Sequence, residues 1–429
     1  VNMQALNKGA RRPKEFDKYD VKKIGILGAG LMGAGIAYVT AKAGIEVVLI
    51  DQDQENAEKG KDYSVKLLDK ALSRKKTTEE KKEKLLSLIT PTTDYGLLKG
   101  ADLIVEAVFE NRDIKAEVTA KAEEQITENA VFGSNTSTLP ISGLAQNSSR
   151  PDNFIGIHYF SPVEKMPLVE IIMGEKTSQE TLAKTMDYVQ KIKKTPIVVN
   201  DSRGFYTSRV FGTYTGEGVA MLAEGIKPAL IENAGKMTGM PMAPLALADA
   251  VALDLAWKVT TQTKKDFEAE GKDFPITPMY SIMEEMVDKQ GRFGKKNNKG
   301  FYEYPENGKK YLWPELSNLC KESDDQPDVE ELKKRFLYIQ AVETAKCFEE
   351  NVLTDVRDAD IGAILGWGMA PWTGGPLSFI DMVGVKDFVA EADKLAQKYG
   401  ERFTPCKLLR DMAAKNESFH KSGNSSQAA

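Results

Sequence analysis

Short apolar runs alternate with stretches of helical periodicity through the first half of the chain. The apolar runs occupy positions 24–27, 47–50, 103–108, 130–132, 154–160, 168–173 and 197–200. Such runs, separated by amphipathic helices, are typical of a doubly wound sheet of mostly parallel strands. After residue 201 the strand signals nearly stop, and helical periodicity dominates over residues 205–237 and 249–267. The pattern therefore predicts an α/β domain followed by an all-helical region.

A glycine-rich turn, GAGLMG at residues 28–33, lies between the first apolar run and a helix. In a G-x-G-x-x-G turn, Gly28 allows the sharp exit from the strand, Gly30 lets a pyrophosphate approach, and Gly33 lets the helix pack closely. The helix start attracts phosphates, and Asp51 after the second strand can accept both ribose hydroxyls of an adenosine. A 2′-phosphate would meet a like charge there. The pattern predicts a Rossmann-type domain that binds NAD rather than NADP; a plain glycine-rich turn is the alternative.

A highly charged stretch at residues 53–89 carries apolar residues at helical spacing. This spacing predicts two amphipathic helices joined near Thr77. Two interpretations stay open: a solvated helical pair without chemistry, and a flap over a long substrate.

Polar residues follow two later strands of the predicted sheet. In doubly wound sheets ligands collect at the carboxyl ends of the strands, so Phe109, Glu110 and residues 134–137 are expected to face the nucleotide. The hydroxyls of Ser134 and Ser137 are expected within reach of a substrate alcohol. A Ser-His-acid hydrolase is a competing interpretation, but no G-x-S-x-G turn surrounds these serines.

Two stretches of the helical region resemble each other, residues 231–254 and the stretch beginning at residue 359. Each has a helix, a glycine stop, a turn containing methionine and proline, then Pro-Leu, and an aspartate four residues after the leucine. These aspartates are Asp249 and Asp381. Internal similarity of this kind predicts a duplicated all-helical domain.

The predicted domains follow from these patterns and from a polar break at residues 322–327. They are a charged lead-in interpreted as a linker (1–20), the NAD-binding Rossmann domain (21–201), the first helical copy (202–321), and the second helical copy with a polar tail (322–429).

The composition of the 429 residues, 41% hydrophobic and 28% charged, is that of an ordinary globular protein. A net charge of −5 argues against a general nucleic-acid binder. No apolar run reaches the roughly 20 residues that span a bilayer. The cysteines lie far apart without a C-x-x-C pattern, so neither a disulfide framework nor a metal site is predicted, and a reducing, cytoplasmic setting is expected. They are Cys320, Cys347 and Cys406.

A nicotinamide transfers a hydride, so the protein must supply a base for the accompanying proton, and histidine suits that task near neutral pH. The chain has two histidines, and His420 lies in the polar tail. His158 lies in an apolar strand, where a lone histidine is often a core residue. If residues 161–167 fold the flanking strands into a hairpin, His158 faces Glu170, with Cβ atoms about 4.5 to 5.5 Å apart. That carboxylate can hold the imidazole and raise its basicity.

Five segments together resemble the 3-hydroxyacyl-CoA dehydrogenase family of fatty-acid β-oxidation: GILGAGLMGAGIA, SNTSTLPI, GIHYFSPVEKMPLVEII, DSRGFYTSR and GKKNNKGFYEYP. They extend over residues 22–305. With the second helical copy, the chain is similar to the dehydrogenase portion of multifunctional β-oxidation enzymes. The lead-in LNKGARRP also resembles the linker that follows the enoyl-CoA hydratase half of those enzymes.

The resemblance implies that His158 is the catalytic base, Glu170 its partner, and Ser137 a contact to the substrate hydroxyl and the cofactor. It also implies NAD contacts at Met32, Asp51, Val108, Phe109, Glu110 and Lys115, with Lys115 near the coenzyme A moiety as well. Ser161, expected at the cofactor, and Ser208, expected at the substrate, stand where many relatives have asparagine. A serine is shorter than an amide, so these contacts are expected to shift or to become water-mediated.

The implied reaction is the NAD-dependent oxidation of a (3S)-hydroxyacyl-CoA to a 3-ketoacyl-CoA. The expected partners are the acyl-CoA substrate and, within a multifunctional complex, a thiolase subunit; nucleic acid and membrane spans are not expected. Two alternatives stay open. One is a dehydrogenase of another small hydroxy acid, and the other is a non-catalytic NAD-binding structural protein.

Overall fold

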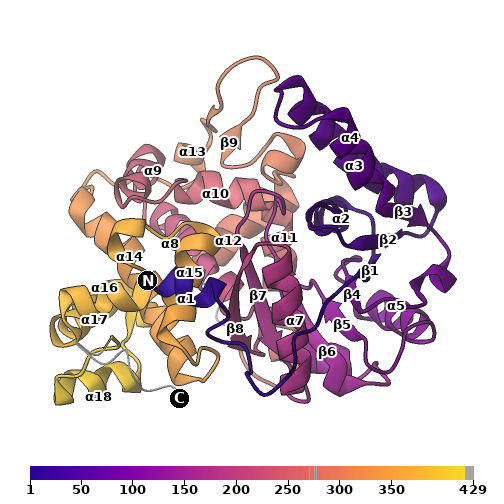
Figure 1. Cartoon of the computed structure of the whole chain (residues 1–429). Helices are drawn as coiled ribbons and strands as arrows, with labels where there is room; N and C mark the ends of the chain where they lie inside the picture. Colours follow the sequence, from indigo (N-terminus) through magenta and orange to yellow (C-terminus); the bar gives the residue numbers. More distant parts are fainter. Residues whose placement is uncertain (270, 275, 277, 421–429) are drawn as a thin grey trace. The chain divides into compact units, whose positions relative to one another are not determined.

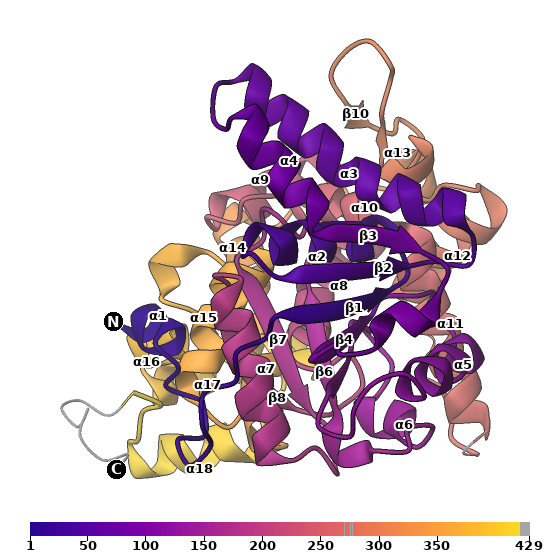
Figure 2. The same cartoon turned by 45° about the vertical axis from the view of Figure 1, so that its right-hand side comes forward.

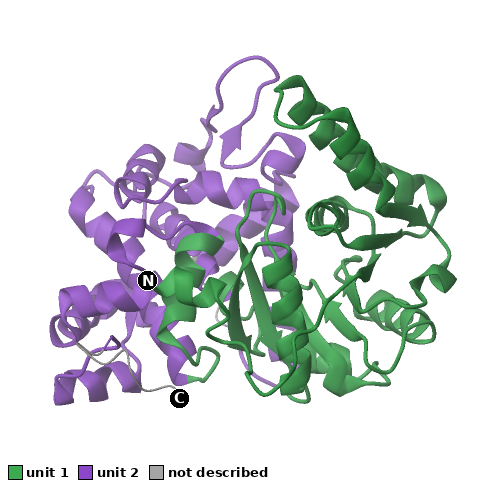
Figure 3. Ribbon diagram, viewed as in Figure 1, with its two compact units in different colours: residues 1–208, 350–366 green, residues 209–349, 367–429 purple. Residues whose placement is uncertain are grey.

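A computed structural model describes residues 1–269, 271–274, 276 and 278–420 (Figure 1). The end of the predicted polar tail, residues 421–429, lies outside the described residues. The chain forms two compact units (Figure 3). Unit 1 comprises Val1–Ser208 and Glu350–Gly366, and unit 2 comprises Arg209–Glu349 and the residues from Trp367 onward.

Unit 1 contains an eight-stranded sheet in the order β3-β2-β1-β4-β5-β6-β7-β8 (Figure 2). Its strands are β1 Lys23–Leu27, β2 Glu46–Ile50, β3 Ile89–Thr92, β4 Leu103–Glu106, β5 Val131–Ser134, β6 Phe154–Tyr159, β7 Leu168–Met173 and β8 Thr195–Asn200. Neighbouring strands run parallel except β6 and β7, which are antiparallel. The predicted doubly wound sheet is confirmed.

Fully buried aliphatic side chains of the strands form the core between the sheet and its helices. The α-helices within residues 1–200 of unit 1, all of which except α1 connect strands of the sheet, are α1 Asn2–Asn7, α2 Leu31–Lys42, α3 Gln54–Ser73, α4 Glu79–Ser87, α5 Arg112–Glu123, α6 Ile141–Ala145 and α7 Gln179–Lys191. The two helices predicted within residues 53–89 are present as α3 and α4, beyond β3 in Figure 2. The prediction that Ile89 continues the second helix is wrong, because it begins strand β3. This edge strand contains Pro91, which an edge tolerates since one side of the strand needs no ladder hydrogen bonds.

The lead-in at residues 1–20, which was predicted to be a linker, is packed against the rest of unit 1. Leu6 is fully buried. The Arg12 guanidinium donates to both carboxylate oxygens of Asp187 at 2.8 Å and to the carbonyl of Phe16 at 2.9 Å. The charge of Arg12 therefore attaches the lead-in to α7, because a bidentate ion pair with Asp187 fixes both the distance and the orientation of the two groups.

Unit 1 also includes residues 350–366, which lie beyond the predicted domain boundary at residue 201. The Asn200 amide donates to the carbonyl of Val352 at 2.8 Å, and the Tyr206 hydroxyl donates to the carbonyl of Ala359 at 2.8 Å. The Asn200 bond, together with a bridge between Val199 and Leu353, extends the edge of the sheet at β8 with a segment that is distant in sequence.

The helical region is made of α8 Thr207–Ala223, α9 Pro228–Met237, α10 Pro244–Val251, α11 Leu253–Ala269, α12 Pro278–Glu284, α13 Leu316–Leu319, α14 Val329–Glu349, α15 Val356–Trp367, α16 Pro376–Val383, α17 Val385–Tyr399 and α18 Lys407–Lys415. A two-stranded sheet, β9 Tyr302–Glu303 with β10 Tyr311–Leu312, accompanies them. Among the described helices, none combines the length and apolarity needed to cross a bilayer.

Each of the two stretches predicted to be helical, residues 205–237 and 249–267, contains parts of two helices. Gly225 has a φ of +81°, and Pro228 then begins α9. Proline is tolerated there because the first N–H groups of a helix have no acceptor within the helix, so the missing N–H of Pro228 costs no hydrogen bond. Ala252 has a φ of +83° and separates α10 from α11. Left-handed residues of this kind end a helix.

Asp249 and Asp381, the matching aspartates of the two similar stretches, have the same role. Asp249 accepts the amides of Phe301 and Tyr302 at 2.8 and 2.9 Å. Asp381 accepts the amides of Phe419 and His420 at 2.9 and 2.7 Å. The duplication stays a prediction, and this shared carboxylate clamp supports it.

Candidate active site

The glycine turn lies at the carboxyl end of β1, where α2 begins. A Cβ built on Gly33 would lie 1.8 Å from the carbonyl oxygen of Gly28, whereas one built on Gly30 would meet no atom within 4 Å. Gly28 has a φ of +95°. The cap residue of α2, Gly30, has no side chain to occupy the free N–H groups of the first turn. The turn therefore combines tight packing at two glycines with open space at the third, which fits a pyrophosphate.

Asp51 follows directly after β2 and lies beside this turn. Its carboxylate accepts the amide of Ala29 at 2.7 Å and that of Gln52 at 2.7 Å. A carboxylate held at this position suits ribose hydroxyls and disfavours a further phosphate. Phe109, at the end of β4, has an exposed side chain (75%), and Met32 is half-buried in α2. The residues present therefore fit NAD.

A buried ion pair lies beneath the carboxyl ends of β4 and β5. The Lys115 ammonium is 2.8 Å from Glu106 Oε1 and 3.3 Å from Glu110 Oε2, and the Lys115 side chain is 3% exposed. The amide of Val108 also donates to Glu106, at 2.9 Å. Lys115 was predicted to contact NAD and coenzyme A, but here its charge is committed inside the unit. These ion pairs connect α5 to the end of β4 and to the segment that follows it.

Ser134 does not present its hydroxyl to a substrate, contrary to the prediction. The hydroxyl donates to Glu106 at 2.6 Å, and the residue is fully buried. Glu110 instead holds the loop after β5, because it accepts the Thr136 hydroxyl and the Ser137 amide. Burial alone would raise the pKa of Glu110, but the charge of Lys115 and these hydrogen bonds lower it. The half-buried Ser137 is thereby positioned at the edge of the sheet.

His158 and Glu170 form the predicted pair. They are direct partners in the antiparallel β6–β7 ladder, and His158 Nδ1 lies 2.8 Å from Glu170 Oε2. The Glu170 side chain is fully buried and that of His158 is 8% exposed. Since an ionised carboxylate only accepts, Nδ1 carries the proton and Nε2 keeps its lone pair.

The sheet register places His158 at the same edge as the glycine turn. β6 runs parallel to β5, with Ser134 opposite Gly156, so His158 lies beyond the last residue of β5. The Asn135 side chain accepts the amide of Tyr159 at 2.9 Å and joins the two strand ends. The histidine and the nucleotide-binding turn therefore share the carboxyl edge of one sheet, within one unit.

Glu170 has three further donors, which the sequence analysis missed. Its Oε1 accepts the amides of Tyr206 and Thr207 at 3.1 and 3.0 Å, and its Oε2 accepts the Thr207 hydroxyl at 2.6 Å. These groups belong to the start of α8, where free N–H groups and the helix dipole stabilise an anion. The segment DSRGFYTSR contains the signal, a threonine at a helix start, but its partner is distant in sequence.

Two aromatic rings pack against the imidazole. The ring centroids of Phe160 and Phe205 lie 4.5 and 6.1 Å from that of His158. Phe205 has a φ of +50°, an uncommon conformation for a bulky residue, and it precedes α8.

Ser161 is exposed in the loop after β6, and Ser208 is half-buried in the first turn of α8. The predicted roles of these two serines stay predictions.

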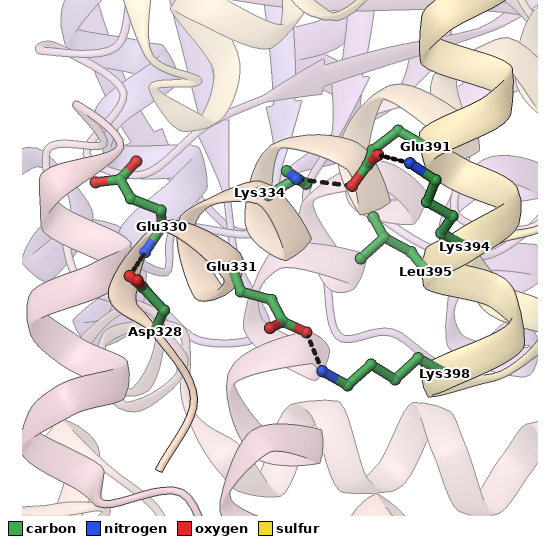
Figure 4. A pocket seen from close by; sticks show the side chains of 8 residues that line it. All are labelled: Asp328, Glu330, Glu331, Lys334, Glu391, Lys394, Leu395 and Lys398. Carbon is green, nitrogen blue, oxygen red and sulfur yellow. Dashed lines mark hydrogen bonds and ion pairs between the residues drawn. The ribbon is translucent and has the colours of Figure 1, made fainter.

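Unit 2 has a separate hollow, lined largely by charged side chains of α14 and α17 (Figure 4). Most of its charges are paired: Glu391 accepts from Lys334 at 2.7 Å, and Glu331 accepts from Lys398 at 2.6 Å. Paired charges of this kind form an ordinary ion-pair surface. Among the described residues, no cluster of His, Cys, Asp or Glu has the arrangement of a metal site.

Comparisons with known proteins agree with this geometry. Residues 23–202 match the family model of the 3-hydroxyacyl-CoA dehydrogenase NAD binding domain, and residues 204–304 match that of the 3-hydroxyacyl-CoA dehydrogenase C-terminal domain.

Three solved structures illustrate the similarity. (S)-3-hydroxybutyryl-CoA dehydrogenase from Ralstonia eutropha is 35% identical, with a TM-score of 0.62 over 67% of this chain and 100% of its own. The dehydrogenase part of a multifunctional enzyme from C. elegans is 26% identical, with a TM-score of 0.66 over 96% of both chains. A 3-hydroxybutyryl-CoA dehydrogenase from Escherichia coli K12, 24% identical, shares the fold with a TM-score of 0.78 over 93% of this chain and 99% of its own.

Proposed function

The chain belongs to the 3-hydroxyacyl-CoA dehydrogenase family, and on this premise we propose that it oxidises (3S)-hydroxyacyl-CoA to 3-ketoacyl-CoA with NAD⁺ in fatty-acid β-oxidation. The general activity, NAD-dependent oxidation of hydroxyacyl-CoA, is that of the family. The observation that carries the proposal is the His158–Glu170 pair at the same sheet edge as the glycine turn.

In the proposed mechanism His158 is the general base. Bound NAD⁺ supplies the acceptor for the hydride from C3 of the substrate. The lone pair of His158 Nε2 takes the proton of the substrate hydroxyl, and the ring becomes positively charged. Glu170, 2.8 Å from Nδ1, stabilises that charge without itself being protonated.

Glu170 can do this because its carboxylate is held in place from both sides. The amides of Tyr206 and Thr207 fix one oxygen, while the Thr207 hydroxyl and the imidazole fix the other. The pair is therefore oriented before any substrate binds. Preorganised groups of this kind need no rearrangement when charge develops.

The remaining roles are proposed from the family resemblance and from placement. Ser137, held by Glu110, and Ser208, in the first turn of α8, are proposed to contact the substrate hydroxyl. Residues Met32, Asp51, Val108, Phe109, Glu110, Ser137 and Ser161 are proposed to surround the cofactor with the glycines at 28, 30 and 33. For Lys115 we propose an indirect role through Glu106 and Glu110, given its burial.

The wider setting is also proposed. Similarity over 96% of both chains to the dehydrogenase part of a multifunctional enzyme supports a place in such an enzyme. A thiolase as an associated subunit is proposed from the family resemblance alone. The three cysteines are free thiols in the structure, which is consistent with a reducing, cytoplasmic setting.

The decisive experiment compares substrates in one assay of NADH formation. We expect turnover of (3S)-3-hydroxybutyryl-CoA, with the (3R) isomer and free 3-hydroxybutyrate slower by at least about 10²-fold. Faster turnover of free hydroxy acids would favour the alternative dehydrogenase class. Absence of turnover with every substrate, together with intact NADH binding, would favour a non-catalytic nucleotide-binding protein.

A further inference from the structure

The loop that joins β6 to β7, residues 160–167, connects His158 to Glu170 through the chain. This connecting loop is attached to both helices that follow the glycine turn. Val163, which is 2% exposed, packs closely on Gly35 of α2: a Cβ built on Gly35 would lie 2.9 Å from the Cβ of Val163. Glu164 accepts the hydroxyl of Tyr63, on α3, at 2.9 Å. The loop is thus a packing link between the His158–Glu170 hairpin and helix α2.

One buried cation holds the backbone of this loop. Lys194 Nζ donates to the carbonyl of Val163 at 2.6 Å and to that of Met166 at 2.5 Å. The residue is 8% exposed. Both carbonyls belong to the turn at residues 162–166, in which the amides of Lys165 and Met166 donate to the carbonyl of Pro162 at 3.0 and 3.1 Å. The Lys194 ammonium therefore stabilises this turn by donating to two of its carbonyls.

The position of Lys194 is set by the end of α7. Lys193 has a φ of +60°, and the amide of Lys194 donates back to the carbonyl of Val189 at 3.1 Å, which is the geometry of a helix C-terminal cap. The next amide, of Thr195, donates to the carbonyl of Pro167 at 2.8 Å and starts the β8 pairing. The backbone on both sides of Lys194 is fixed, so its ammonium has a defined place.

A buried ammonium is unfavourable unless its donors are satisfied. An apolar side chain could fill the same space without that penalty, but it would leave two buried carbonyls without their donor. The Lys194 ammonium therefore does what an apolar side chain cannot: it donates hydrogen bonds to two carbonyls of the connecting loop, whose buried residue Val163 packs on α2.

We infer that Lys194 is a positioning residue for the dehydrogenation: its charged ammonium fixes the connecting loop and so holds the His158–Glu170 hairpin in register with the nucleotide-binding helix α2. This inference rests on the proposed function for its link to turnover. The holding of the loop itself is a property of the protein without ligands.

The same geometry makes the device sensitive to alkaline pH. Burial lowers the pKa of Lys194 to about 8, with Glu164 in the loop raising it and Lys42 in the last turn of α2 lowering it. When the ammonium loses its proton, the two charge-assisted bonds to Val163 and Met166 become weaker neutral ones. The loop is therefore held more firmly in neutral than in mildly alkaline solution.

The test compares the wild type with Lys194→Met in the reduction of acetoacetyl-CoA by NADH, from about pH 6.5 to about pH 9.5, a range that brackets the lysine titration. Lys193→Met is the matched control, because it removes the same charge from an exposed neighbouring position. Effects of pH that all three proteins share cancel in the ratio of their kcat values. Hydrogen exchange of the Lys165 and Met166 amides, corrected for its intrinsic pH dependence, reports the loop without substrate.

We expect wild-type kcat to exceed that of K194M about 10-fold near pH 7, the scale of one lost charge-assisted bond. This ratio should fall toward one above about pH 9, as the wild type loses the same charge. Exchange of the two amides should rise in K194M at neutral pH and in the wild type above about pH 8, while K193M follows the wild type.

A ratio that is constant with pH would mean that the side chain only fills space, and a ratio of one throughout would mean that it does not matter; either result overturns the inference. If the wild type shows no turnover, the proposed function fails, and unchanged exchange in K194M would then separately overturn the holding of the loop. If K194M does not fold, the wild type alone decides, because exchange of these amides that does not rise above about pH 8 contradicts the inference.

Discussion

Replacing Glu170 by glutamine tests the orientation of His158 with almost no change in shape. Oε1 of Glu170 accepts two backbone amides, so the single oxygen of the glutamine must stay on that side. Its NH₂ group then faces His158 Nδ1 and the Thr207 hydroxyl, in place of the oxygen that both now contact. An NH₂ group donates, so it drives the imidazole proton from Nδ1 to Nε2. The lone pair that takes the substrate proton is lost.

The expected magnitude follows from that loss. A general base contributes about 10²- to 10⁴-fold to turnover, so kcat of E170Q should fall by about that factor. The two backbone bonds remain, so the fold should persist; a loss of about 1 kcal/mol would shift Tm by only about 2–4 °C in a domain of this size. Binding of NADH should be unchanged, because Glu170 contacts no residue of the glycine turn.

The assay is NADH formation from (3S)-3-hydroxybutyryl-CoA under saturating substrate, with Tm and NADH affinity measured on the same samples. Glu175→Gln is the matched control, since it makes the same substitution at an exposed position just beyond β7. The reasoning is refuted if E170Q retains more than half of the wild-type kcat while its Tm and NADH affinity are unchanged. Equal losses in both variants would point to a general charge effect.

Three further predictions concern the cofactor turn and a buried carboxylate. Gly30→Ala should leave Tm unchanged but weaken NADH binding about 10-fold or more. Gly33→Ala should lower Tm, because the new Cβ would collide with the carbonyl oxygen of Gly28. Calorimetry and NADH titration distinguish the two variants, and equal effects of both substitutions on Tm and on NADH affinity would contradict the account. Asp51→Ser should weaken NADH binding and narrow the preference over NADPH, as measured by fluorescence titration, and an unchanged preference would exclude Asp51 from the ribose site. Burial raises the pKa of Asp358 to about 7, against a lowering by Arg11. Relative to an unfolded pKa of about 4, stability is then lost as pH rises from about 4 to about 7. The Tm of Asp358→Asn should therefore gain on the wild type across this range, and a pH-independent difference would contradict the shift.

Much of unit 1 was predictable from sequence because its signals are local. The glycine turn, the apolar strand runs and Asp51 are all recognisable within a short window. The pairing of His158 with Glu170 was also predictable, since a short hairpin connection fixes the register of its strands. Local pattern and tertiary structure agree at these positions.

The remaining features depend on contacts between distant segments. Thr207 and Tyr206 donate to Glu170 only because α8 starts beside β7. The hydroxyl of Ser134 donates to Glu106, which lies on a different strand, β4. Residues 350–366 pack on the edge of the sheet through two backbone contacts that no local pattern signals. The helix breaks at Gly225 and Ala252 were missed because helical periodicity continues across them.

Turnover of the His158→Gln variant tests the central claim most directly. Glutamine cannot accept the proton as a base, so kcat for (3S)-3-hydroxybutyryl-CoA oxidation should fall by about 10²-fold or more, while NADH affinity and Tm stay near those of the wild type. A kcat close to the wild-type value in that folded, NADH-binding variant would contradict the assignment of His158 as the base.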